Sequence, residues 1–335
     1  MTLRIITGGL QTTVQDLGRI GRQRTGIPVC GAMDRFAHRV ANMLVGNDDG
    51  AATLEASLLG PAIAFDEPAV IALAGGDLSA TINGNDVAPW HAMAVPQGAR
   101  LRFGEARSGC RTYIAVAGGL DLPPVFGSRS TYLRAEFGGL DGRALRSGDV
   151  LNPGPMSPTA ERVASALRES GATAIGRWTV ARSVRPLYND DPIVRVIPGE
   201  HHELLDDASR ERLVSATFKV SSSSDRMGYR LGGVSLSLDE PKELLSEGVA
   251  FGTIQLPPGG EPIVLMADHQ TTGGYPRIGE VASVDLPLIA QLKPGDRLRF
   301  RLVSVEKAQQ AYLAQERDLA MARAAIELRY SRGAS

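Results

Sequence analysis

The chain has 335 residues, of which 43% are hydrophobic and 22% charged, and its formal net charge is −1 at pH 7. That length predicts two domains, and the near-neutral, dispersed charge argues against a nucleic-acid partner. No apolar run approaches the roughly 18 to 20 residues that cross a bilayer, and no secretory signal precedes the first strand, so we expect a cytoplasmic protein with no membrane partner.

The first half of the chain is predicted to be mostly β. One helix is expected early, in MDRFAHRVANMLVGN, where apolar residues recur at helical spacing and Gly46-Asn47 provides a stop. Short β-rich runs between turn signals then follow near 69–75, 79–84, 100–106 and 111–119. Many brief strands at close spacing indicate a barrel or sandwich.

The second half is predicted to be another β domain, reached through a linker. Residues 153–190 are rich in Pro, Ser, Ala and Gly and contain one short helical pattern. A strand near 193–199, a helix near 206–215 and a hairpin at TIQLPPGGEPIVLMAD follow, with the turn at Pro257 to Gly260. We therefore expect domains at 1–152 and 191–303, and a C-terminal helix over 304–330.

The loop after that hairpin, ADHQTTGGYP, is the first candidate site. Its short polar side chains and paired glycines suit close contact with a ligand, and successive N–H groups could bind an anion. A turn in which these side chains satisfy their own backbone explains the same pattern. The residues concerned are Asp268, Gln270, Thr271, Thr272, Gly273 and Gly274.

Three further polar segments are candidates. SSSSDRMGYRLGG places Asp225 beside Arg226, a guanidinium suited to carboxylate, phosphate or amide, although an Asx turn with an exposed arginine is the alternative. The long polar passage 127–149 contains Arg129 and Tyr132. The third candidate combines residues 11–26, which carry Asp16, with residues 31–34, which end at Asp34, and its polar groups could line a cleft or cap the first helix.

Several familiar chemistries lack their sequence signature. Cys30 and Cys110 are the only cysteines, so we interpret both as reduced and structural. The five histidines show no i, i+4 pair with an acid, which argues against a metal. No G-x-S-x-G elbow and no glycine-rich nucleotide loop follows a strand.

Taken in order, several segments resemble one known family between residues 3 and 303. They include TTVQDLGRIGRQRTGIPVCGAMDRFAHRVANMLVGN, GSRSTYLRAEFGGLDGRALRSGD, SSDRMGYRLGG and ELLSEGVAFGTIQLPPGGEPIVLMADHQTTGGYPRIG. The family is variously called allophanate hydrolase subunit 2, the KipA-like proteins, or the C subunit of 5-oxoprolinase. It also corresponds to half of the carboxyltransferase domain of urea carboxylase.

The resemblance implies a mainly β fold of two cyclophilin-like β-barrel domains with a few helices. It implies an amide hydrolase subunit that works with a homologous, KipI-like B subunit and an A subunit to convert 5-oxo-L-proline to L-glutamate with ATP. One alternative is the carboxyltransferase subunit of a biotin-dependent urea carboxylase system. Another is a KipA-type regulatory protein that binds a kinase inhibitor.

An amide substrate needs an acceptor for its N–H and donors for its oxygen, which suggests roles for the candidate residues. With the family in view, Asp268, Gln270 and Asp225 are expected to be catalytic. The expected substrate-binding residues are Arg226, Arg129, Tyr132, Thr271, Thr272, Gly273, Gly274, Asp16 and Asp34.

The sequence also departs from the family in ways that restrict these expectations. Family members usually carry serine where this chain has Cys30, so Cys30 is not expected to be a nucleophile, and the position of His269 varies. ATP is expected to act with the complex, without a recognisable site on this chain. None of the four lysines lies in a Met-Lys-Met setting, so biotin would have to arrive on another protein.

Overall fold

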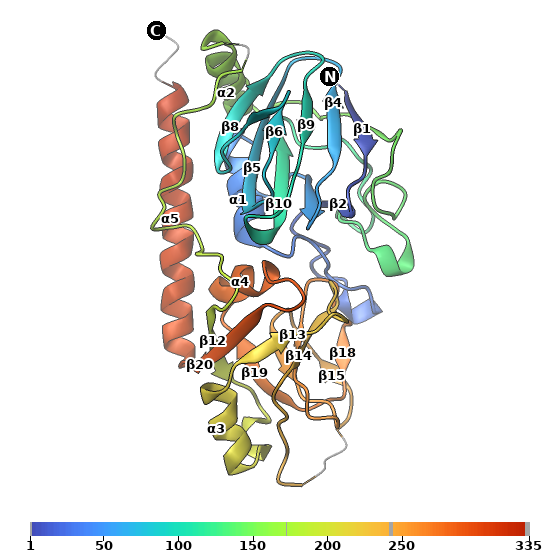
Figure 1. The fold of residues 1–335 in the computed structure, drawn as a ribbon, viewed down its shortest axis with the longest axis vertical. Coiled ribbons are helices and arrows are strands. Elements are labelled where there is room, and N and C mark those ends of the chain that lie inside the picture. The colour runs from blue at the N-terminus through green and yellow to red at the C-terminus, as the bar shows by residue number, and fades with distance from the viewer. Residues whose placement is uncertain (1, 172, 241–243, 332–335) are drawn as a thin grey trace. The chain divides into compact units, whose positions relative to one another are not determined.

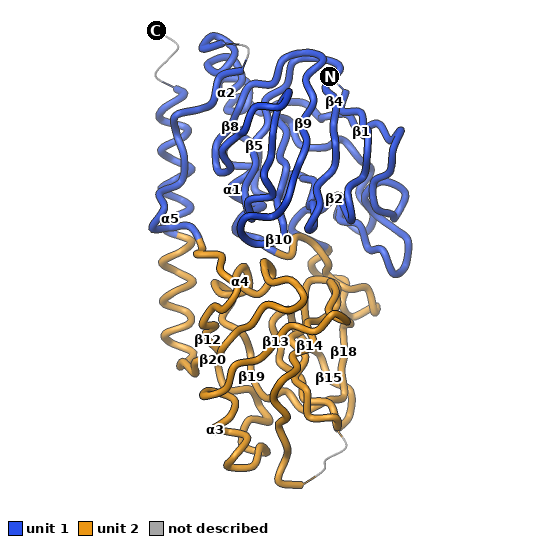
Figure 2. Tube along the Cα trace, viewed as in Figure 1, with its two compact units in different colours: residues 1–18, 34–185, 317–335 blue, residues 19–33, 186–316 orange. Residues whose placement is uncertain are grey.

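A computed structural model describes residues 2–171, 173–240 and 244–331, and its chain divides into two compact units (Figure 2). Unit 1 comprises residues 1–18, 34–185 and 317–335, and unit 2 comprises residues 19–33 and 186–316. The mainly β fold with a C-terminal helix is confirmed (Figure 1). The unit boundaries differ from the expected ranges, because 19–33 packs with unit 2 and 153–185 with unit 1.

Unit 1 is built on two antiparallel sheets. One has the strand order β11-β1-β4-β9-β6-β7 and the other β2-β3-β10-β5-β8, so its described strands form two sheets, in agreement with the barrel or sandwich that the strand pattern predicts. Buried side chains such as Leu54, Phe65 and Ile114 form its core. The strands are β1 Leu3–Thr7, β2 Gln11–Gln15, β3 Thr53–Ser57, β4 Ala62–Phe65, β5 Ala69–Asp77, β6 Thr81–Ile82, β7 Asn85–Asp86, β8 His91–Val95, β9 Arg100–Arg102, β10 Ser108–Val116 and β11 Val150–Leu151.

The predicted early helix is α1, Arg35–Leu44, which packs on β5 and β10 of unit 1. It begins where the Asp34 carboxylate accepts a hydrogen bond from Ala37 N at 2.8 Å, an N-cap that satisfies one of the free N–H groups of the first turn. It ends before Gly46, whose φ of 78° closes the last turn. The helical periodicity of the sequence thus predicts this element correctly.

Unit 2 contains a closed barrel with the order β12-β19-β16-β17-β14-β13-β20, in which β12 and β20 pair in parallel. Its core includes Phe218, Ile254 and Phe300, and it also takes in Met33 from the 19–33 segment. The predicted hairpin is confirmed, since Ile254 of β16 pairs with Val264 of β17. The strands are β12 Ile193–Pro198, β13 Phe218–Val220, β14 Gly228–Gly232, β15 Glu247–Gly248, β16 Thr253–Gln255, β17 Ile263–Leu265, β18 Thr272–Gly273, β19 Arg277–Val281 and β20 Arg297–Leu302.

Four further α-helices complete the described part of the chain. They are α2 Pro158–Glu169, α3 Asp207–Ser215, α4 Leu286–Ala290 and α5 Val305–Ser331, and short 3-10 turns lie at Gln23–Thr25, Leu133–Ala135, His202–Leu204 and Ser283–Asp285. The helical patterns expected near 206–215, inside 153–190 and over 304–330 correspond to α3, α2 and α5. Within the described residues, no helix is both long and apolar enough to span a membrane.

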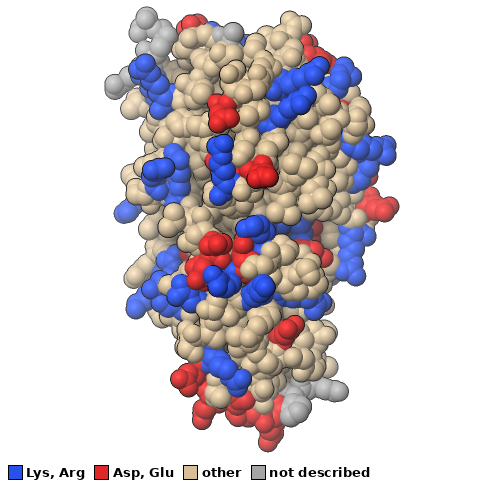
Figure 3. Space-filling model, viewed as in Figure 1, with Lys and Arg blue, Asp and Glu red and all other residues tan. Residues whose placement is uncertain are grey.

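Charged side chains of both signs are interspersed on the face of the molecule shown in Figure 3. Ion pairs of the described residues include Arg4–Asp66 in unit 1 and Arg299–Asp191 in unit 2. Such exposed pairs contribute little to stability, typically less than about 1 kcal/mol each.

Candidate functional site

Arg226 and Asp268 form a buried ion pair in unit 2, at the ends of the neighbouring strands β14 and β17. Two parallel hydrogen bonds join them, from Arg226 Nε to Asp268 Oδ2 at 2.9 Å and from Nη2 to Oδ1 at 3.0 Å. The backbones of the two residues are also joined, because Asp268 N donates a hydrogen bond to Arg226 O at 2.8 Å. The arginine of this segment is therefore buried and paired, in contrast to the exposed arginine of an ordinary turn.

The 19–33 segment reaches this ion pair through Cys30 and Gly31. Arg226 Nη2 also donates to Gly31 O at 2.6 Å, and the Cys30 thiol hydrogen-bonds to Asp268. Burial and the adjacent Asp268 carboxylate raise the pKa of the Cys30 thiol far above its usual range. Cys30 is consequently a neutral thiol donor, a role that a serine hydroxyl can also fill.

Gln255 is a second buried polar group of unit 2, and no pattern in the sequence marks it as a candidate. It is the last residue of β16 and only 2% exposed. Its Oε1 lies 3.5 Å from Gln270 Nε2, at the outer limit of a hydrogen bond. Among the described residues, none accepts a hydrogen bond from Gln255 Nε2.

Gly273 packs directly on Gln255. A Cβ atom at position 273 would lie 2.4 Å from Gln255 Nε2, and neither Gly273 nor Gly274 has a positive φ. The glycine is required here by close approach, and the two glycines do not form the left-handed turn that an anion nest uses. Thr272 and Gly273 instead form β18, which pairs with β15.

Glu280 adds a titratable group on the adjacent strand β19. It pairs with Thr253 of β16, and both of its carboxylate oxygens lie within 3.0 Å of Thr253 Oγ1. Burial raises the pKa of Glu280, an effect only partly offset by the Thr253 hydrogen bond and by Arg277. A carboxyl group of this kind can exchange a proton at milder pH than an exposed glutamate.

The remaining candidates of unit 2 have local roles. Asp225 Oδ1 accepts hydrogen bonds from Met227 N at 2.8 Å and Gly228 N at 3.2 Å, which is the Asx turn considered from the sequence. Thr271 O accepts a hydrogen bond from Val249 N at 3.2 Å, beside the β15–β18 pair. His269, nearly fully buried, donates from Nδ1 to Gln270 O at 2.6 Å.

Asp16 and Arg129, both of unit 1, lie together. The Asp16 carboxylate accepts from Ser128 Oγ, Ser130 Oγ, Arg129 N and Gly18 N at 2.5 to 2.8 Å. Burial raises the pKa of Asp16, but these four hydrogen bonds outweigh it and the net shift is downward. The Arg129 side chain points elsewhere and donates from Nε to Leu122 O at 2.7 Å.

Tyr132 and Asp34 of unit 1 also have structural partners. The Tyr132 ring packs edge to face against Phe137, with the ring centroids 5.5 Å apart. Asp34 caps α1, and its N–H donates to Tyr113 Oη at 2.7 Å, while Tyr113 Oη donates to Glu55 Oε2 at 2.7 Å. Burial and the Glu55 carboxylate raise the pKa of Tyr113, so its hydroxyl stays protonated.

A groove of about 700 Å³ lies in unit 2 near the Gln255–Gly273 contact. Leu256 and Gly274, the chain neighbours of those two residues, are among its lining residues. The volume is within the range of small-molecule sites, and apolar walls with a few hydroxyls are typical of them. The other lining residues are Ser235, Leu236, Ser237, Leu238, Leu244, Pro257, Pro258, Gly259, Gly260, Tyr275 and Pro276.

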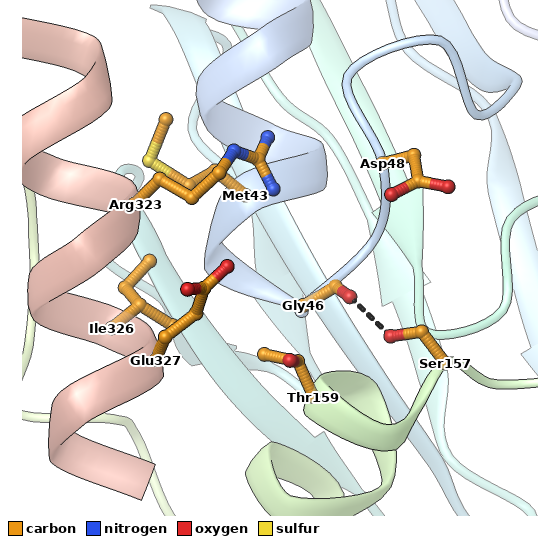
Figure 4. Close-up of a pocket in the computed structure, with 8 residues that line it drawn as sticks. All are labelled: Met43, Gly46, Asp48, Ser157, Thr159, Arg323, Ile326 and Glu327. Carbon is orange, nitrogen blue, oxygen red and sulfur yellow. Dashed lines mark hydrogen bonds between the residues drawn. The ribbon is translucent and has the colours of Figure 1, made fainter. Parts of the chain in front are cut away.

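A smaller cavity, of about 110 Å³, lies in unit 1 (Figure 4). Ser157 Oγ donates to Gly46 O at 2.7 Å at its border, and Arg323 of α5 donates to Asn47 O at 3.2 Å and pairs with Asp49. Its volume is below the 300 to 1,000 Å³ of typical ligand pockets. We therefore assign it a structural role, the joining of α1, α2 and α5.

The polar groups of unit 2 are chemically suited to a neutral, hydrogen-bonding ligand. The charges of Arg226 and Asp268 compensate each other, and the amide groups of Gln255 and Gln270 offer a donor and an acceptor. Composition alone identifies Asp268, Arg226 and Gln270 as candidates. Gln255 could have been noticed as the one amide between apolar residues in TIQL.

Comparison with known proteins identifies the chain as a carboxyltransferase-type domain. The family model described as carboxyltransferase domain, subdomain A and B, matches residues 25–302. The C subunit of the Escherichia coli 5-oxoprolinase is 40% identical over 315 residues, which cover 94% of this chain and 96% of that protein. The chain therefore belongs to the carboxyltransferase domain, subdomain A and B, family.

Two yeast proteins show the same domain inside longer chains. The urea amidolyase of Saccharomyces cerevisiae is 31% identical, over 95% of this chain but only 17% of its own length. The crystal structure of the K. lactis urea amidolyase matches with a TM-score of 0.86 at 30% identity, over 96% of this chain and 20% of that chain. The fold of the present chain is thus a component of larger enzymes.

Proposed function

We propose that this protein is the C subunit of an ATP-dependent 5-oxoprolinase, which converts 5-oxo-L-proline to L-glutamate together with an A and a B subunit. The observation that carries the proposal is the 40% identity to the C subunit of the Escherichia coli enzyme, which extends over nearly the full length of both chains. The shared length argues for the same role in an assembly, because the yeast relatives match only as part of a longer protein.

The candidate site of unit 2 supports an amide as the substrate. A lactam is uncharged at the bond that is cleaved, so its binding requires hydrogen bonds more than a free ionic partner. Gln270 and the neighbouring Gln255 supply such groups, while Arg226 and Asp268 hold the loop that carries Gln270. The ring opening also requires proton transfer, for which Glu280 is a candidate, because it lies on β19 beside β16, the strand that ends at Gln255, and because burial raises its pKa.

In this proposal ATP and the partner subunits complete the reaction. Phosphorylation of the lactam oxygen would turn a poor electrophile into one that water can attack, and the developing negative charge would need donors. The sequence contains no familiar phosphate-binding loop, so ATP is assigned to the complex and to no residue of this chain. We place the complex in the cytoplasm, and activity is expected only when all three subunits are present.

The proposal is tested by reconstitution. The purified chain is combined with the A and B subunits, and glutamate formation from 5-oxo-L-proline is measured with and without ATP. Omission of this chain should abolish glutamate formation. If the complete set releases no glutamate, the chain is not a 5-oxoprolinase subunit.

A second candidate function is a carboxyltransferase component of a biotin-dependent, urea-carboxylating system. The family description and the similarity to urea amidolyases favour it. The two functions require different co-substrates, since this one needs bicarbonate and a biotinylated carrier protein. Bicarbonate-dependent turnover of urea, with no turnover of 5-oxo-L-proline, would select it.

A further inference from the structure

We propose that Gln255 and Gln270 together recognise the amide edge of the substrate, with Gln255 Nε2 donating to the carbonyl oxygen and Gln270 Oε1 accepting from the N–H. The proposal rests on the proposed function and names the contacts that select the substrate class. Gln255 becomes a specificity-determining residue, although it lies outside the conspicuous ADHQTTGGYP segment.

The first observation is the unused donor of Gln255. Its side chain is buried, yet among the described residues nothing accepts a hydrogen bond from Nε2. Buried polar groups in folded proteins nearly always have a partner, so an unused donor marks a place where a ligand can supply one. Gln270 is half-buried, and its Nε2 lies 3.5 Å from Gln255 Oε1, the other end of the same carboxamide.

The second observation is that the two amides are only half paired. Two carboxamides that face each other can form two hydrogen bonds, but here only Gln270 Nε2 and Gln255 Oε1 approach, at 3.5 Å. Gln255 Nε2 is thus a donor with no acceptor among the described residues, and the other side chain of the pair offers the acceptor Gln270 Oε1.

This donor–acceptor pair complements a specific chemical group. A lactam ring fixes its amide in the cis form, so that the carbonyl oxygen and the N–H lie on one edge. Urea presents the same edge. An ester, a carboxylate or an N-substituted lactam lacks the N–H and would satisfy only half of the pair.

Access to the donor requires a small movement of the β15–β18 pair. Gly273 of β18 covers Gln255 Nε2, and each of these strands has only two residues. The groove is lined by Leu256, which follows Gln255 in the chain, and by Gly274, which follows Gly273. We therefore infer that substrate enters from the groove and that β18 lifts to admit the amide edge.

The test uses a pair of matched glutamine variants in the reconstituted complex. Gln255→Glu keeps the shape and replaces the donor by an acceptor, whereas Gln291→Glu makes the same change at another glutamine of unit 2 that is also 2% exposed. We expect Gln255→Glu to raise the KM for 5-oxo-L-proline by about tenfold or more, since it removes a donor and adds repulsion. Gln291→Glu should leave it within about twofold.

A second measurement separates recognition from a merely structural role. Wild-type protein should be inhibited more weakly by N-methyl-2-pyrrolidone than by 2-pyrrolidone, because only the latter donates to Gln270 Oε1. Gln270→Leu should abolish this preference, while Gln255→Glu should weaken both ligands and retain it. If Gln255→Glu does not fold by circular dichroism, Gln255→Met, which lacks the donor without adding charge, takes its place.

The outcomes distinguish this inference from the proposed function. Glutamate production by the wild-type complex, with equal KM values for the variants at 255 and 291, would overturn the amide-edge contact alone. If the wild-type complex makes no glutamate, a second measurement tests the contact. It is the change in melting temperature of the full chain on addition of 5-oxo-L-proline or urea. A shift lost in Gln255→Glu would support the contact, and no shift in the wild type would overturn it.

Discussion

Arg226 and Asp268 hold a loop in place because the charge of each residue neutralises the charge of the other. Both side chains are buried, and Cys30 and Gly31 bind to them from a segment almost 200 residues away, the separation between Arg226 and Gly31 being 195. A buried charge without its partner is strongly unfavourable. The pair therefore fixes the 19–33 segment to the barrel of unit 2.

We expect Asp268→Ala to destabilise the protein by about 3 to 5 kcal/mol, because it leaves Arg226 buried and uncompensated. Urea unfolding followed by circular dichroism measures the change. Cys30→Ser is the matched control, since it preserves a donor to Asp268, and it should cost less than about 1.5 kcal/mol. Equal stability of Asp268→Ala and the wild type would show that the ion pair does not hold the loop.

His38 of unit 1 should make stability depend on pH. It is fully buried, its Nε2 donates to Asp49 O at 2.9 Å, and its Nδ1 lies 2.9 Å from Thr53 Oγ1. Burial lowers its pKa from 6.5 to about 4, although Asp16 and other carboxylates oppose the shift. Below pH 6.5 the unfolded chain binds a proton that the folded chain does not, so stability falls as the pH decreases toward 4.

The expected loss between pH 7 and pH 5 is about 2 kcal/mol from this group. Urea unfolding at the two pH values measures it. His38→Gln removes the titration and should show a smaller difference between the two pH values than the wild type. An identical pH dependence of the variant and the wild type would contradict the buried, neutral state of His38.

At the scale of single residues, the sequence predicts part of the candidate site. Asp268, Arg226 and Gln270 are found because charged and amide groups stand out beside glycines and apolar runs. Gln255 is not found, because its importance depends on Gly273 and Gln270 approaching it through space. The role of Cys30 as a donor to Asp268 likewise depends on a contact between distant segments.

Among the elements, α2 shows how a single hydroxyl can join two helices. Ser157 Oγ accepts from Ala160 N at 3.0 Å as the N-cap of α2 and donates to Gly46 O at the end of α1 (Figure 4). A Cβ at Gly46 would lie 2.6 Å from Ala160 N, so the two helix ends are in close contact. The segment expected to be a linker is therefore firmly attached to unit 1 through this end of α2.

Ser157→Ala should destabilise the protein by about 1 to 2 kcal/mol, since it removes both the cap and the bond to Gly46. Ser165→Ala on the same helix is the control, because the hydrogen bond from Ser165 Oγ to Glu169, at 2.9 Å, is exposed to solvent. Thermal unfolding of the two variants gives the comparison. A larger effect at Ser165 than at Ser157 would argue against the N-cap.

Helices and strands are predictable from the sequence when the interactions that form them join residues close together in the chain. Helices α1, α3 and α5 are predicted well because their periodicity and caps are local in sequence. The β16–β17 hairpin is predicted from its Pro-Pro-Gly-Gly turn. The parallel pairing of β12 with β20 and the short β15–β18 pair are not predicted, since they join segments far apart in the chain.

At the scale of the whole molecule, each of the two units is built from segments that are not continuous in the chain. Residues 19–33 are read from the sequence as part of the N-terminal domain but pack with unit 2, and Met33 is fully buried in its core. Composition indicates a domain change near 153–190, yet it cannot show that an earlier segment crosses over. That assignment depends on contacts such as Arg226 with Gly31.

A fragment limited to residues 186–316 should therefore not fold properly. It lacks Met33 in its core and the Gly31 acceptor of Arg226, so we expect poor dispersion in its amide NMR spectrum and binding of an apolar dye. A fragment in which residues 19–33 are joined to 186–316 by a flexible linker should recover a dispersed spectrum. A well-folded 186–316 fragment would show that the 19–33 segment is dispensable.

The same interrupted order has a consequence during translation. Unit 2 takes its first segment from the beginning of the chain and the rest from the second half, while unit 1 takes its last segment, the end of α5, from the final residues. A ribosome synthesises the N-terminal residues first. The core that buries Met33 is therefore complete only after some 280 further residues have been added, up to Glu316. Neither unit is therefore complete on a half-made chain, and a chain that stops before Glu316 contains no complete unit.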